Sequence, residues 1–74
     1  MKATVTNVES VLRSINVSTT EYFNSIDECD NNSVFIRLNS SYRYADCLEE
    51  IETALEEQFD MMCFVNGDIM LTSK

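Results

Sequence analysis

The sequence predicts an α+β fold in which a small antiparallel sheet packs against a long acidic helix. Three observations indicate it. Apolar residues recur at helical spacing from Tyr44 to Asp60. Residues Ser33 to Leu38 alternate in the manner of a strand, and Asn66-Gly67 separates two apolar runs, which is the strongest short signal of a β-hairpin. The prediction is a three-stranded antiparallel sheet, with four strands as the alternative, and a short N-terminal helix.

Length and composition indicate one soluble domain that spans residues 1–74. An apolar fraction of 45% is ordinary for a globular protein and too high for a disordered one. The net charge of −8, from thirteen acidic and five basic residues, argues against direct binding of nucleic acid or of an anionic membrane. It favours a basic protein as the partner.

The first third of the chain contains two candidate helix starts. Thr6-Asn7-Val8-Glu9 has the form of a capping box, so we expect a first helix from Asn7 to Asn16. The segment from Ser18 to Cys29 fits a helical stripe, although its Thr, Tyr, Phe and Ile residues prefer strands. A helix is the favoured reading of this segment, and a strand is the alternative.

A turn at Asp30-Asn31-Asn32 leads into the strand Ser33 to Leu38. A two-residue turn at Asn66-Gly67 would pair Val65 with Asp68. Cross-strand partners share a face of the sheet. This register predicts two apolar faces: the first holds Met62, Phe64, Ile69 and Leu71, and the second holds Met61, Cys63, Val65 and Met70.

A sheet that is apolar on both sides needs cover on both sides. We expect the acidic helix to cover one face. The second face would be covered by the first helix or by a second copy of the chain, which makes Met61, Cys63 and Met70 the candidate surface for a homodimer.

The acidic stretch carries seven carboxylates and no Lys or Arg: Asp46, Glu49, Glu50, Glu52, Glu56, Glu57 and Asp60. As one helix it would contain six like-charge pairs three or four residues apart, which cost roughly 1–3 kcal/mol in total. Its last turn would also lack the cation that the helix dipole favours. A cost of that size in a small domain indicates a functional surface. The alternative is a merely solvated face that keeps the protein soluble.

The spacing of these carboxylates predicts a function. Fourteen helical steps of about 1.5 Å place one carboxylate per about 3 Å, close to the phosphate spacing of a DNA strand, about 3.4 Å. In this general character the chain is similar to small acidic phage-encoded blockers of nucleic-acid enzymes. We expect a non-enzymatic inhibitor that binds a basic nucleic-acid-handling partner through these seven residues. Tyr42 and Tyr44 are candidates for further anchors, and the alternative is that they cover the edge of the small core. The alternative is a self-associating accessory or structural subunit that docks through an apolar sheet face.

The residue patterns of the usual catalytic and cofactor sites are missing. There is no His, and Gly67 is the only glycine, so the usual triads, most zinc sites and phosphate-binding loops are excluded. Three widely spaced cysteines do not make a disulfide framework. We therefore expect no enzyme activity, cofactor or metal, reduced cysteines with Cys47 and Cys63 in the core, and a cytoplasmic location.

Overall fold

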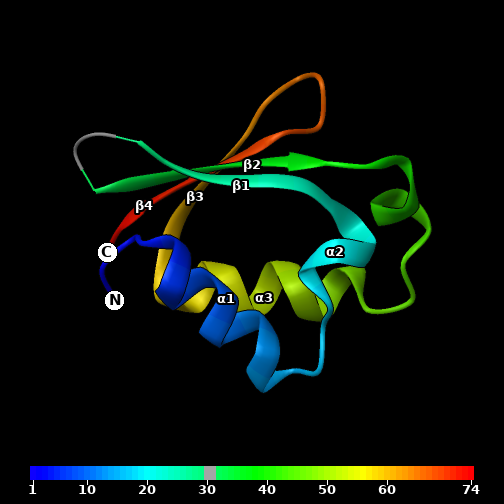
Figure 1. Cartoon of the computed structure of the whole chain (residues 1–74), viewed down its shortest axis with the longest axis horizontal. Helices are drawn as coiled ribbons and strands as arrows, with labels where there is room; N and C mark the ends of the chain where they lie inside the picture. Colours follow the sequence, from blue (N-terminus) through cyan, green and yellow to red (C-terminus); the bar gives the residue numbers. More distant parts are fainter. Residues whose placement is uncertain (30–31) are drawn as a thin grey trace.

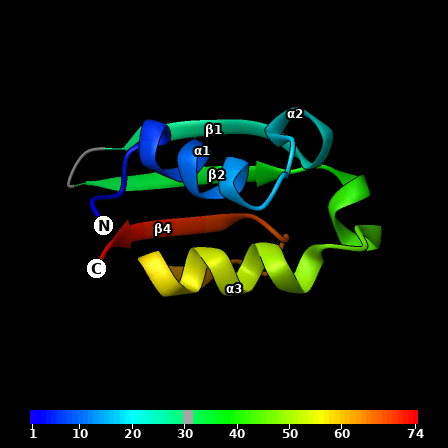
Figure 2. The same cartoon turned by 90° about the horizontal axis from the view of Figure 1, so that it is seen from below.

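The computed structural model describes residues 1–29 and 32–74 and has two layers, a sheet and a layer of helices (Figures 1 and 2). The sheet is antiparallel and four-stranded, in the order β1-β2-β4-β3. This confirms the α+β prediction. The elements in chain order are α1 (Val5–Ser14), α2 (Thr19–Tyr22), β1 (Phe23–Cys29), β2 (Ser33–Leu38), the 3-10 helix η1 (Ser40–Tyr44), α3 (Leu48–Gln58), β3 (Phe59–Cys63) and β4 (Ile69–Ser73).

Helix α1 begins two residues earlier than the sequence predicted. The side chain of Thr4, in extended backbone, accepts a hydrogen bond of 3.1 Å from the backbone N–H of Asn7. It is therefore Thr4 that caps the helix, and the capping box expected at Thr6 is wrong. The helix ends before Asn16, whose positive φ of 61° turns the chain away.

The favoured helix over Ser18 to Cys29 is wrong beyond its first turn. Only Thr19–Tyr22 is helical, and Phe23–Cys29 is strand β1. The strand pairs with β2 in a register that sets Ile26 opposite Ile36. Pairing with a neighbouring strand therefore outweighed the helical spacing of the apolar residues. The turn predicted at Asp30 and Asn31 lies outside the described residues.

Helix α3 is shorter than the predicted Tyr44–Asp60 at both ends. The side chain of Asn39 accepts a hydrogen bond from the N–H of Ser41 and starts η1, which ends at Tyr44. At the other end Phe59 is already extended and begins β3. Of the six predicted like-charge pairs, only Glu49/Glu52 and Glu52/Glu56 lie within α3. The like-charge cost therefore falls to roughly 0.4–1 kcal/mol.

The β3–β4 hairpin exists, but its register differs by one residue from the prediction. Cys63 pairs with Ile69 and Met62 with Met70. The N–H of Phe64 donates to the carbonyl of Asp68, and Gly67 has a φ of +96°. The loop therefore holds three residues and closes on a glycine in the left-handed region, another common hairpin form. A shift of one residue moves side chains to the opposite face.

Both longer helices pack against the same face of the sheet. In Figure 2, α1 lies over β1 and β2, and α3 lies over β4 and β3. The core is closed by side chains with no exposed surface, which come from both layers: Val8, Leu12, Ile51 and Leu55 from the helices, and Val34, Ile36, Phe59 and Leu71 from the strands. The expectation that the first helix covers the second face of the sheet is therefore wrong.

The chain contains an internal repeat that the sequence did not reveal. Each half consists of a long helix followed by a hairpin, and the two hairpins meet through β2 and β4. The cross-strand pair Ile26–Ile36 corresponds to the pair Met61–Leu71, whose residue numbers are higher by 35 and which is also observed. The same holds for Glu28–Val34 and Cys63–Ile69. The two halves are related by an approximate twofold axis between β2 and β4.

The helices follow the same relation with a different offset. The fully buried Val8 and Leu12 of α1 correspond to Ile51 and Leu55 of α3, at an offset of 43. The offset falls from 43 to 35 because the first half has eight more residues, 15–22, between helix and hairpin. The left-handed residues Asn32 (φ 58°) and Gly67 (φ 96°) also correspond.

We expect the substitution Gly67→Ala to lower the free energy of unfolding by about 1 kcal/mol, because a side chain is strained at this positive φ. Space is not the cause, since a Cβ at Gly67 would meet only the Nη2 of Arg43, at 4.0 Å. Denaturant unfolding measures the effect. The matched control is Asn32→Gly, which should cause no comparable loss. Equal stability of Gly67→Ala and the unsubstituted protein would contradict the strained turn.

Candidate functional site

A groove runs between α1 and α3 on the face of the molecule that lies away from the sheet. It consists of two adjoining hollows of about 480 and 310 Å3. The two hollows share Ile15, Ala54 and Glu57 in their linings, so they form one continuous depression. The groove exists because the two helices pack side by side on one face of the sheet.

The groove has an apolar floor and one acidic wall. Ile15 and Ala54 are partly buried and pack against the core, and they form the floor with Val11. The α1 wall carries the small hydroxyl side chains of Ser10 and Ser14. The acidic wall consists of four carboxylates from α3 and the turn before it: Asp46, Glu49, Glu50 and Glu57. No Lys or Arg is among the described residues that line either hollow.

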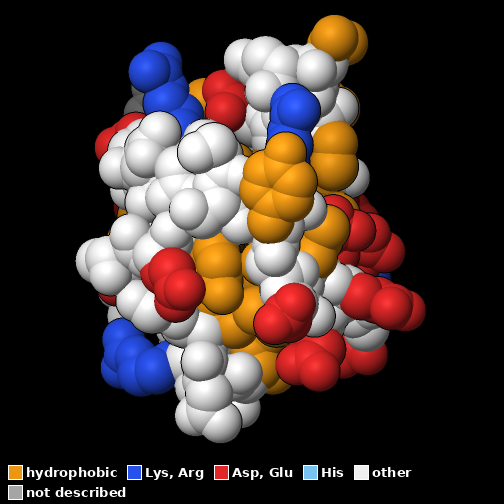
Figure 3. Space-filling view, turned by 90° about the vertical axis from the view of Figure 1, so that its right-hand side faces the viewer, with side chains coloured by type: hydrophobic (Ala, Val, Ile, Leu, Met, Phe, Trp, Pro, Cys, Tyr) orange, Lys and Arg blue, Asp and Glu red, His pale blue; other side chains and the backbone are white. Residues whose placement is uncertain are grey.

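The distribution of charge over the surface agrees with this lining. In Figure 3, acidic side chains gather at the lower right, on the side where α3 lies, while Lys and Arg are few and scattered. Apolar atoms are visible between the acidic groups. A ligand in the groove would therefore meet apolar surface below and negative charge on one side. A cationic group with an apolar stem matches such a surface.

Four of the nine predicted site residues line this groove, and the others lie elsewhere. The hydroxyl of Tyr42 donates a hydrogen bond of 3.3 Å to Oε1 of Glu52. Tyr42 is buried, and burial together with the charge of Glu52 raises its pKa well above the ordinary value. The hydroxyl therefore stays protonated, and Glu52 serves an internal contact. Tyr42 is a core residue and not a surface anchor.

Glu56 and Asp60, near the C-terminal end of the acidic stretch, do not line the groove. Asp60 lies in β3 between the inward-facing Phe59 and Met61, so its side chain is on the opposite face of the sheet. Glu56 is exposed, and its backbone carbonyl accepts a hydrogen bond of 2.9 Å from Nζ of Lys74. The last turn of α3 has no Lys or Arg of its own, as predicted, but the ammonium of Lys74 from beyond β4 contacts one of its carbonyls. The first turn carries Glu49 and Glu50, where the helix dipole favours negative charge.

The outer face of the sheet is the second surface that the sequence singled out. It holds a row of apolar side chains: Phe35, Met62, Phe64 and Met70. The rings of Phe35 and Phe64 lie 5.7 Å apart, and Met62 is 59% exposed. Phe64 and Met62 were predicted to share a face with Ile69, which instead lies in the core.

The homodimer surface predicted from Met61, Cys63 and Met70 is not a single face. Met61 and Cys63 pair with Leu71 and Ile69, whose side chains point toward the helices. Met70 pairs with Met62 on the outer side. The one-residue change of register explains the separation.

The cysteines and acidic groups give no further site within the described residues. Cys29, Cys47 and Cys63 are free thiols, and Cys63 is exposed, not part of the core as predicted. Residues 1–29 and 32–74 contain no cluster of three or more His, Cys, Asp or Glu side chains suited to a metal ion. Within the same residues no helix is long and apolar enough to cross a membrane.

Comparisons with known proteins identify no relative of the chain. No protein-family model matches it, and it has no match among curated proteins or solved structures. What the groove can do therefore follows from its own residues.

Proposed function

We propose that the protein is a non-enzymatic inhibitor that binds a basic protein surface through the groove between α1 and α3. The four carboxylates of the acidic wall take the place of nucleic-acid phosphates on that surface. The partner is a protein that handles nucleic acid and is blocked by this occupation. The observation that carries the proposal is the meeting of one-signed charge and an apolar floor in a single groove.

The internal repeat supports a role for this charge beyond stability. In α1 the positions that correspond to Glu49, Glu50 and Glu57 are Thr6, Asn7 and Ser14. Both helices occupy equivalent places on the same sheet, and each buries two apolar side chains fully: Val8 and Leu12 in α1, Ile51 and Leu55 in α3. The fold is therefore satisfied with a neutral polar surface at these positions. The carboxylates of α3 are a property of one half and not a requirement of the architecture.

The spacing of the glutamates also supports phosphate mimicry, over a shorter length than the sequence suggested. Three of the five glutamates of α3 line the groove: Glu49, Glu50 and Glu57. The eight helical steps from Glu49 to Glu57 span roughly 12 Å at about 1.5 Å per step, which is one of these three carboxylates per about 4 Å. A DNA strand carries one phosphate per about 3.4 Å. A basic site built for phosphates can therefore accept this side of the helix, with association accelerated by charge.

We expect the combined substitution Glu49→Gln, Glu50→Gln and Glu57→Gln to weaken partner binding by roughly tenfold or more, because it removes most of the acidic wall. The measurement is capture of partner proteins from a lysate of native host cells, with quantification of the main captured protein. A thermal melt should show little change, since all three side chains are exposed. Undiminished capture by this variant would contradict the groove as the binding site.

A matched control separates position from net charge. The control variant also loses three negative charges, but from exposed positions outside the groove: Glu21→Gln, Asp27→Asn and Asp60→Asn. This control should capture the partner as well as the unsubstituted protein does. Equal losses in both triple variants would show that only overall charge matters.

We expect binding to weaken steeply as salt is raised from 0.1 to 1 M. The Debye length falls from about 10 Å to about 3 Å over this range, so attraction between charges is screened. Elution of the captured partner over a salt gradient measures the effect. Binding that persists at 1 M salt would favour an apolar interface.

A second candidate function is supported by the uncovered outer face of the sheet. Phe35, Met62, Phe64 and Met70 lie there, and both longer helices are on the other side. An accessory subunit that self-associates would bury this row against a second copy. Such an interface is apolar at its centre and responds little to salt.

Sedimentation of the purified protein separates this candidate from the first. Self-association through the outer face predicts a dimer at about 100 µM that Met62→Glu converts to a monomer, because the substitution would bury a charge. Cys29→Ser, at an exposed position of β1, serves as the control. A monomeric unsubstituted protein at this concentration would rule the second candidate out.

A further inference from the structure

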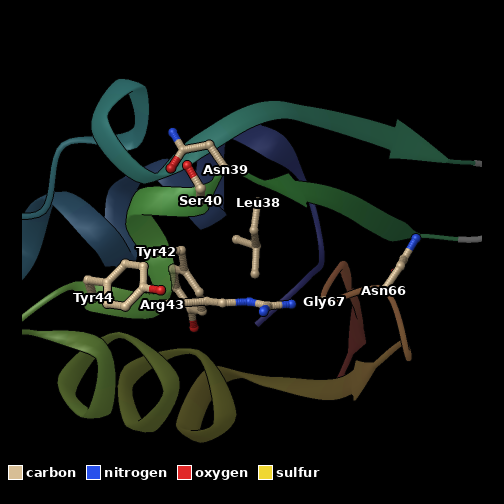
Figure 4. Close-up of a pocket in the computed structure, with 8 residues that line it drawn as sticks. All are labelled: Leu38, Asn39, Ser40, Tyr42, Arg43, Tyr44, Asn66 and Gly67. Atoms are coloured by element: carbon tan, nitrogen blue, oxygen red, sulfur yellow. The ribbon is translucent and has the colours of Figure 1, made fainter.

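A cavity of about 490 Å3 lies at one end of the molecule, away from the acidic groove. It forms where β2 leads into η1 and where the β3–β4 loop turns back toward them (Figure 4). Its lining shares no residue with the α1–α3 groove. It is therefore a separate feature of the surface.

The charge of this cavity is opposite to that of the protein as a whole. Arg43 is the only charged residue among the described residues that line it. In Figure 4 the side chain of Arg43 extends from η1 toward Gly67 at the hairpin tip. Its Nη2 would lie 4.0 Å from a Cβ at Gly67, so the guanidinium reaches the β3–β4 loop. Within the described residues it has no hydrogen-bond or ion-pair partner.

The two asparagine side chains of the lining, Asn39 and Asn66, already form hydrogen bonds within the protein. Asn39 donates to the carbonyl of Glu21 and accepts from the N–H of Ser41. Asn66 accepts from the N–H of Asp68 and donates to its carboxylate. These side chains hold their own turns. The guanidinium of Arg43 is left as the strongest donor that faces the cavity.

The rest of the lining is suited to a flat apolar group. In Figure 4, Leu38 lies next to the Arg43 side chain, and the rings of Tyr42 and Tyr44 lie near the backbone end of Arg43, on the side away from Gly67. Tyr44 is 84% exposed, so its ring offers a free face. Gly67 adds no side chain that would fill the space. Aromatic rings and guanidinium planes both stack on flat ligands.

We propose that this cavity binds a small organic anion, whose carboxylate or phosphate pairs with Arg43 and whose flat body lies on Leu38 and Tyr44. A guanidinium forms two parallel hydrogen bonds with either anionic group, which makes Arg the usual residue for such recognition. The carboxylate of Asp68 is held beside the cavity by its hydrogen bond from Asn66, while charges more than about 8 Å away are largely screened at physiological ionic strength. The site is independent of the proposed inhibitor function.

The test is an NMR titration that follows the backbone amide signals of Ser40 and Gly67. The probes are phenyl phosphate and benzoate, with inorganic phosphate as the anion without a ring and phenol as the ring without charge. We expect saturable shifts with phenyl phosphate or benzoate, and at least about fivefold weaker binding of inorganic phosphate and of phenol. The tighter of the two aromatic anions identifies the acidic group.

Substitutions locate the anion contact. Arg43→Gln should weaken binding of the aromatic anion by about tenfold or more. The affinity of Arg43→Lys should lie between those of Arg43→Gln and the unsubstituted protein, because Lys keeps the charge without the planar guanidinium. The matched control is Arg37→Gln, at an exposed position of β2, which should leave the affinity unchanged. No saturable shift with either aromatic anion, or equal affinity in Arg43→Gln, would overturn the proposal. Equal binding of inorganic phosphate and phenyl phosphate would overturn the assignment of the flat body.

Discussion

The burial of two amphipathic helices against a single face of the sheet is the interaction on which the rest of this structure depends. Val8 and Leu12 of α1 and Ile51 and Leu55 of α3 are all fully buried there. In a domain of this size the core is small, and truncation of one such residue to Ala costs about 2–5 kcal/mol. Because both helices are used on one side, the other face of the sheet stays open. Because they lie side by side, their solvent edges form the groove.

Much of the fold was predictable, since its signals are local. Alternation over Ser33–Leu38 and the Asn66-Gly67 turn identified a strand and a hairpin correctly. The register was not predictable, because a loop of two or three residues fits the same sequence. The observed three-residue loop shifts the register by one residue, so the β3 side chains pair with different β4 partners than predicted. The predicted homodimer surface is therefore divided between the two faces of the sheet. Strand β1 was predicted only as the alternative to a helix, because pairing with β2 is a long-range effect that helical spacing does not report.

The candidate site was predictable in composition but not in arrangement. Charge and spacing identified the acidic residues, yet only the packing of α1 beside α3 shows that Glu50 and Glu57 face a groove. Glu52 lies outside the groove because its carboxylate accepts a hydrogen bond from Tyr42, and this contact depends on the position of η1. The internal repeat was hidden because most corresponding positions share burial but carry different residues, as Met61 and Ile26 do. The change of offset between helices and hairpins concealed it further.

The repeat separates what the fold requires from what it leaves free. Interior positions correspond closely, as in Leu12 and Leu55, because both halves must fill one core. Surface positions do not. The counterparts of Glu49 and Glu57 are Thr6 and Ser14, and the counterparts of the apolar Met62 and Phe64 are Asp27 and Cys29. The acidic wall and most of the apolar outer row therefore belong to the second half of the chain. The first half adopts the same architecture without the acidic wall and with only Phe35 in the outer row, so the architecture itself requires neither feature.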